Sequence, residues 1–124
     1  NMPHIKLEYT ENVQWKKPVQ KLFPKLQSVL IQYAGVKLEN WKSRATQLKE
    51  YLSNIDGSPG GFTHLEISLL SGRSETVKTK IGTECTQIIC ELLEDVTQAQ
   101  VSVEIRDMDK NNYFTTKKTK IIWI

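Results

Sequence analysis

The chain contains the same short pattern twice: a strand-like segment, a helix-like segment and a second strand-like segment. Residues 4–10 (HIKLEYT) and 64–70 (HLEISLL) open the two halves with alternating apolar and polar side chains, the period of a half-buried strand. A strand–helix–strand unit crosses over right-handed and leaves its two strands parallel. The repeat therefore predicts an α+β (α/β) fold, a tandem β-α-β arrangement with a four-stranded sheet and both helices on one face.

The first helix is predicted from apolar residues at helical spacing over residues 19–33. Pro18 suits the first turn of this helix and Gly35 its end. Pro24 conflicts with the prediction, because an interior proline kinks a helix or restarts it.

The second helix is predicted over residues 77–96, with Ser74 as its N-cap. Residues 43–53 form a long polar strand after the first helix, and residues 101–105 form a clearer alternating strand after the second. The glycine- and proline-rich residues 56–61 mark the turn between the halves.

Size and composition indicate one globular domain, residues 1–124, with halves at about 3–56 and 62–124. No apolar run approaches the roughly 18–20 residues that span a bilayer, and no leader is apparent, so we expect a cytoplasmic protein without a membrane partner. A net charge of +3 is weak evidence for nucleic acid, and no nucleic-acid partner is expected.

The cysteines and histidines indicate no metal or cofactor. Cys85 and Cys90 lie five apart in an apolar segment and are expected to be buried, reduced thiols. His4 and His64 occupy matching places in the repeat, but no further ligand accompanies them at a suitable spacing.

Met2-Pro3 suggests a processed terminus. Methionine is usually removed before a small residue, which would leave Pro3 with a free secondary amine. An α-amine titrates at roughly pH 7.7–8.0, so modest desolvation or a nearby cation makes it a general base. Asn1 is interpreted as a residue added for expression, and with it attached the Pro3 nitrogen is an amide without basicity. The alternative is that Pro3 merely begins a strand.

One face of the predicted sheet has no helix to cover it. Trp41, Trp123 and residues 121–124 are also too apolar to lie comfortably in water. We therefore expect self-association, although the tail could instead pack back on its own core.

Three segments together point to a family. Residues 2–12 (MPHIKLEYTEN) resemble the opening of the 5-carboxymethyl-2-hydroxymuconate isomerases of the tautomerase superfamily. Residues 70–74 (LSGRS) resemble the Gly-Arg-Ser that precedes the family's second helix, and residues 103–105 followed by Phe114 form a weaker match. The resemblance covers nearly the whole chain.

The resemblance implies a tautomerase-like homotrimer with an active site at each amino-terminal proline. It implies a cofactor-independent isomerase in which Pro3 is catalytic and moves a proton along an unsaturated 2-hydroxy or 2-oxo carboxylic acid. In the family, the muconate isomerase acts in the bacterial breakdown of aromatic compounds.

The same resemblance implies the substrate-binding residues. Arg73 matches the family's arginine, whose planar fork can hold a carboxylate with two hydrogen bonds. Lys42 stands where the family pattern has arginine and keeps the charge but not the fork, and Arg44, on the same face of the strand, could compensate. Phe114 is expected to line the pocket and keep it dry.

Other functions stay open at this point. The same amine could serve a hydratase or a dehalogenase, and the lysine substitution also allows a non-catalytic relative. A ferredoxin-like binding module for RNA or a regulatory ligand would need stacking aromatics on its central strands, which residues 5–8 and 101–104 do not offer.

Overall fold

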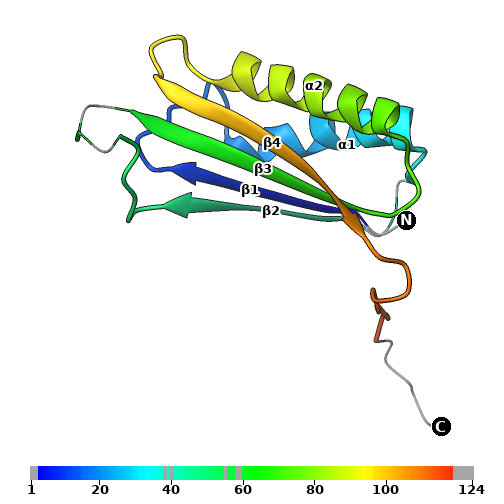
Figure 1. Cartoon of the computed structure of the whole chain (residues 1–124). Helices are drawn as coiled ribbons and strands as arrows, with labels where there is room; N and C mark the ends of the chain where they lie inside the picture. Colours follow the sequence, from blue (N-terminus) through cyan, green and yellow to red (C-terminus); the bar gives the residue numbers. More distant parts are fainter. Residues whose placement is uncertain (1–2, 38, 40, 55, 58–59, 119–124) are drawn as a thin grey trace, which may run out of the picture.

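The computed structural model describes residues 3–37, 39, 41–54, 56–57 and 60–118. Its sheet has the strand order β2-β1-β3-β4, and both helices cover one face (Figure 1). The pairs β1–β2 and β3–β4 are parallel, whereas the central pair β1–β3 is antiparallel. The predicted tandem β-α-β topology is confirmed. The strands are β1 (His4–Thr10), β2 (Lys42–Leu48), β3 (Gly61–Leu70) and β4 (Ala99–Met108).

The first helical segment consists of a 3₁₀ turn, η1 (Val19–Lys21), and the helix α1 (Leu22–Ala34). Pro24 is the third residue of α1 and lies in its first turn, where a backbone N–H has no partner within the helix. The conflict over Pro24 therefore disappears. Pro18 precedes the 3₁₀ turn, so the prediction that it begins the α-helix is wrong.

Gly35 ends α1 in the left-handed conformation, with φ of 66°. We expect Gly35→Ala to lower the free energy of unfolding by about 1 kcal/mol, because a Cβ strains this conformation. Gly82→Ala is the matched control with the opposite sign. Gly82 lies inside α2 (Glu75–Leu92), and apart from its chain neighbours and the adjacent backbone of its own helix, no described atom lies within 4 Å of an added Cβ. Alanine there should stabilise by roughly 0.5–1 kcal/mol. Urea unfolding of both variants measures the two shifts, and shifts of the same sign would contradict the prediction.

The helix α2 begins as the sequence predicts. The hydroxyl of Ser74 accepts a hydrogen bond from the Val77 backbone N–H at 3.2 Å, which confirms it as the N-cap. The helix ends at Leu92, and Val96 is 77% exposed, so its place in the apolar stripe was wrong.

The strand β2 is shorter than predicted and ends at Leu48. Its partner β1 stops at Thr10, and the backbone N–H of Glu11 donates to the Leu48 carbonyl at 3.0 Å. Beyond this bond β1 offers no further strand to pair with. The end of β2 therefore depends on its neighbour rather than on its own sequence.

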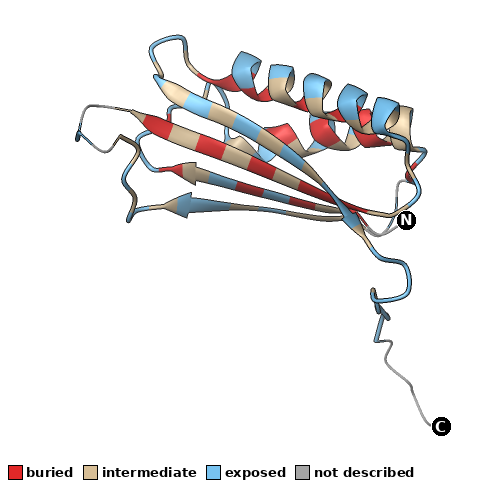
Figure 2. Ribbon diagram, in the orientation of Figure 1, coloured by how far each residue is buried: buried red, intermediate tan, exposed pale blue. Residues whose placement is uncertain are grey.

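The hydrophobic core lies between the helices and the sheet. Along most of β1 and β3, buried and less buried residues alternate as the pleat requires (Figure 2), while Thr10 and Ser68 are buried out of phase with the pattern. Cys85 is buried in α2, and desolvation, with a smaller contribution from Glu84, raises the pKa of its thiol to about 12. Cys90 is exposed, so the prediction of two buried thiols is wrong for it.

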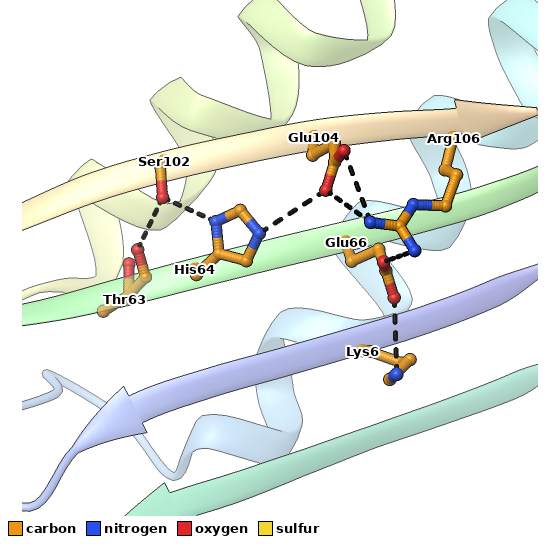
Figure 3. Close-up of polar contacts among 7 residues, drawn as sticks. All are labelled: Lys6, Thr63, His64, Glu66, Ser102, Glu104 and Arg106. Carbon is orange, nitrogen blue, oxygen red and sulfur yellow. Dashed lines mark hydrogen bonds and ion pairs between the residues drawn. The ribbon is translucent and has the colours of Figure 1, made fainter. Parts of the chain in front are cut away.

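The opposite face of the sheet carries paired polar side chains (Figure 3). Glu66 on β3 accepts from Arg106 of β4 at 2.9 Å and lies 3.4 Å from the Lys6 ammonium of β1. His64 Nδ1 lies 2.6 Å from the Ser102 hydroxyl. The Glu66 side chain is only 14% exposed although no helix covers it. This face is therefore charged and internally paired.

None of the described helices is both long and apolar enough to cross a membrane.

Candidate functional site

Pro3 is buried and immediately precedes β1. Its carbonyl accepts a hydrogen bond from the Lys42 backbone N–H at 3.3 Å. The next residue, His4, pairs with Lys42 on β2 and with Ser68 near the end of β3. Pro3 therefore lies at the end of the sheet where β1 and β2 begin and β3 finishes.

Lys42 and Arg44 project from the face of the sheet away from the helices. The residue between them, Ser43, faces α1, because its hydroxyl accepts from the Gln27 side-chain amide at 3.1 Å. Since alternate residues of a strand point to opposite faces, Lys42 and Arg44 share the other face with their register partners His4 and Lys6. The sequence prediction of a shared face is confirmed.

These cations affect the histidine beside them. The pKa of His4 is lowered, first by burial and then by the charges of Arg44, Lys42 and Lys6. The positive charges of Arg44, Lys42 and Lys6 therefore all act on the imidazole of His4, the residue that follows Pro3. Such a surface attracts an anion.

His4 also contacts the segment that follows β4. Its Nε2 lies 2.9 Å from the hydroxyl of Tyr113, with the two rings edge to face at 5.8 Å between centroids. Its Nδ1 lies 3.1 Å from Nη1 of Arg44. The histidine thus connects β1, β2 and the carboxyl-terminal segment.

Arg73 lies at the same end of the sheet but is bound to backbone. Its Nη1 donates to the Leu70 carbonyl at 2.8 Å and its Nη2 to the Ala34 carbonyl at 3.1 Å. Ala34 is the last residue of α1, where the helix dipole favours a cation. The arginine therefore holds the end of β3 to the end of α1, a structural role that the sequence prediction missed. Its substrate contact stays a prediction.

We expect Arg73→Met to lower the free energy of unfolding by about 1.5–3 kcal/mol, because the partly buried carbonyls of Leu70 and Ala34 lose a charged donor. Lys110→Met is the matched control, since Lys110 lies near Gly72, with Nζ 3.5 Å from an ideal Cβ there, on the surface of the same region. Thermal unfolding of both variants measures the difference. Equal melting temperatures would contradict the structural role of Arg73.

Phe114 is 86% exposed in the single chain. It follows Tyr113, so the bond to His4 keeps it near the end of the sheet that carries Pro3. The segment leaves β4 at that end and extends away from the sheet (Figure 1). The pocket-lining role of Phe114 stays a prediction. The predicted apolar tail, residues 121–124, lies outside the described residues.

The described residues contain no group of three or more His, Cys, Asp or Glu side chains that could hold a metal ion.

Two residues that make polar contacts at this end of the sheet, His4 and Tyr113, were not predicted from sequence to contact each other. His4 was interpreted as part of a duplicated strand, and Tyr113 was not singled out. Their contact joins residues 109 positions apart, and no local pattern signals it.

Comparison with known proteins places the chain in a family. The sequence profile described as 5-carboxymethyl-2-hydroxymuconate isomerase matches residues 3–122. A search of curated proteins gave no significant match.

Solved structures agree on the fold. The crystal structure of a 5-carboxymethyl-2-hydroxymuconate isomerase from Deinococcus radiodurans R1 superposes with a TM-score of 0.79 at 27% identity, over 94% of this chain and 90% of the other. A 5-carboxymethyl-2-hydroxymuconate delta-isomerase gives 0.74 at 18% identity, over 95% and 89%. A fused 4-OT symmetric trimer gives 0.69 at 16% identity, over 86% and 87%.

Proposed function

The chain belongs to the 5-carboxymethyl-2-hydroxymuconate isomerase family, and from this premise we propose that it isomerises a small unsaturated 2-hydroxy or 2-oxo carboxylic acid. The family supports an isomerase or tautomerase function in general. The particular substrate class and the role of Pro3 are our proposal.

The observation that carries the proposal is the position of Pro3. It is buried beside the strand that presents Lys42 and Arg44, and the family match begins at this residue. As a free amine in partly desolvated surroundings beside cations, Pro3 would have a lowered pKa and could act as a base near neutral pH.

The proposed reaction is a proton transfer. From a 2-oxo acid the Pro3 nitrogen takes a proton from the carbon between the carbonyl and the alkene, and from a 2-hydroxy acid such as 2-hydroxymuconate it takes the proton of the 2-hydroxyl group. In both cases it returns the proton to a carbon farther along the conjugated chain. Negative charge develops on the dienolate oxygen, and a fixed cation near that oxygen lowers the barrier. Lys42 and Arg44 are the proposed partners of the dienolate and the substrate carboxylate.

We also propose that the active form is a homotrimer. The fused 4-OT structure of similar fold is a symmetric trimer. The exposed Phe114 and the sheet face without helices are surfaces that a second copy would cover. In a trimer, Phe114 would exclude water from the site.

A substrate panel tests the proposed reaction class. Chains beginning at Pro3 are expected to change the conjugation-dependent absorbance of 2-hydroxymuconate and to leave halo-acrylic acids intact. Release of halide without isomerisation would favour the dehalogenase, the alternative that Lys42 leaves open. If neither 2-hydroxymuconate nor the halo-acrylic acids react, the result would favour the alternative of a non-catalytic relative.

A further inference from the structure

The hydrogen bonds of His4 determine its protonation state. A guanidinium has donors only, so Nδ1 of His4 must accept the bond from Arg44 Nη1 at 3.1 Å and carries no proton. The proton of the neutral ring is then on Nε2, which donates to the Tyr113 hydroxyl at 2.9 Å. Both ring nitrogens are therefore hydrogen-bonded, Nδ1 as an acceptor and Nε2 as a donor.

We propose that His4 is a positioning residue for Arg44: its neutral, Nε2-protonated ring orients the guanidinium toward the carboxylate of the substrate and ties the segment carrying Tyr113 and Phe114 to the site. This inference rests on the proposed function, because it assigns Arg44 a substrate carboxylate. It adds His4 and Tyr113 to the site. These two residues do not touch the reacting atoms but fix the positions of Arg44 and of the segment that carries Phe114.

The arrangement is sensitive to acid. Protonation of Nδ1 would set an N–H against the N–H of Arg44, and the contact would be lost. The charged groups facing His4 are Lys42 and Arg44 on β2 and Lys6 on β1, and all three oppose protonation. On β3 the residue opposite His4 is the uncharged Ser68, and from the carboxyl-terminal segment Tyr113 faces it. The ring is therefore neutral at physiological pH.

Two substitutions separate positioning from simple packing. His4→Asn keeps an oxygen near the place of Nδ1 that accepts from Arg44 but cannot titrate, whereas His4→Leu removes the acceptor. His64→Asn is the matched control. Like His4, His64 lies on the face of the sheet that no helix covers, but it is on β3 and is bonded to Ser102. All variants are prepared as chains beginning at Pro3, checked by intact mass.

With 2-hydroxymuconate as the probe, we expect His4→Leu to raise KM about tenfold and to change kcat less than about threefold, since one oriented charge-assisted bond is lost. His4→Asn should keep the wild-type KM at neutral pH. Because the pKa of His4 is lowered, the wild-type KM should also rise in acid, at a pH below the ordinary histidine pKa of about 6.5. This rise should be absent in His4→Asn and retained in His64→Asn. An unchanged KM in His4→Leu, or an acid rise that persists in His4→Asn, would overturn the proposal.

A measurement without turnover separates this inference from the proposed function. ¹⁵N NMR of the imidazole should show the Nε2–H tautomer of His4 in the wild type and a mixture in Arg44→Gln. If the wild type does not convert 2-hydroxymuconate, the proposed function fails while the tautomer still supports or refutes the contact with Arg44. An Nδ1–H tautomer in the wild type would overturn the inference whatever the activity.

Discussion

A chain that begins at Pro3 is expected to convert 2-hydroxymuconate with a kcat/KM about 10²–10⁴-fold above that of the chain carrying Asn1 and Met2, the usual contribution of a general base. In the longer chain the Pro3 nitrogen is part of a peptide bond and cannot accept a proton. In the shorter chain it is a secondary amine, in a residue whose carbonyl is hydrogen-bonded to the Lys42 backbone N–H. Initial rates from absorbance, with termini verified by intact mass, measure the ratio.

The comparison needs equal folding of the two proteins. Far-UV circular dichroism, the melting temperature and the assembled mass should agree between them, because Asn1 and Met2 precede the first strand. Equal rates in two equally folded proteins would contradict a role for the amine.

Replacing both strand cations should have the second largest effect. We expect Arg44→Gln and Lys42→Gln each to raise KM by about 10–100-fold, the value of one charge-assisted hydrogen bond. The KM of the double variant should be higher than that of either single variant. Both side chains project from the face of the sheet that carries His4. Steady-state kinetics on chains beginning at Pro3 measure the effect.

Lys6→Gln is the matched control for this pair. Lys6 is also a cation on that face and is the register partner of Arg44, but its ammonium lies 3.4 Å from the Glu66 carboxylate. Its loss should change KM less than about threefold, since the ammonium of Lys6 is paired with the Glu66 carboxylate and is not assigned to the substrate. A KM effect of Lys6→Gln as large as that of Arg44→Gln would mean that general charge, and not the position of Arg44, attracts the substrate.

Local signals in the sequence were sufficient for the architecture. Alternation over residues 4–10 and 64–70 reflects burial of one strand face, and the chain follows it in β1 and β3. Ser74 and Gly35 act on backbone groups within a few residues of themselves, so their capping roles could be predicted.

The errors involve features that other parts of the chain decide. The strand β2 ends where β1 stops offering a partner, and Val96 has helical spacing but follows the end of α2. Arg73 was predicted from its Gly-Arg-Ser context, which says nothing of the Ala34 carbonyl 39 residues away. His4 and Tyr113, which also contact each other, are even farther apart along the chain. Only tertiary structure brings such groups together.

The proposed mechanism depends on the basicity of one nitrogen, and titration of ¹⁵N-labelled Pro3 in the processed chain tests it most directly. Burial and the nearby cations predict a pKa below the roughly 7.7–8.0 of an ordinary α-amine, and the acid limb of kcat/KM should fall at that same pKa. An amine that titrates at its ordinary value or above, or an acid limb that does not follow its titration, would contradict the assignment of Pro3 as the base.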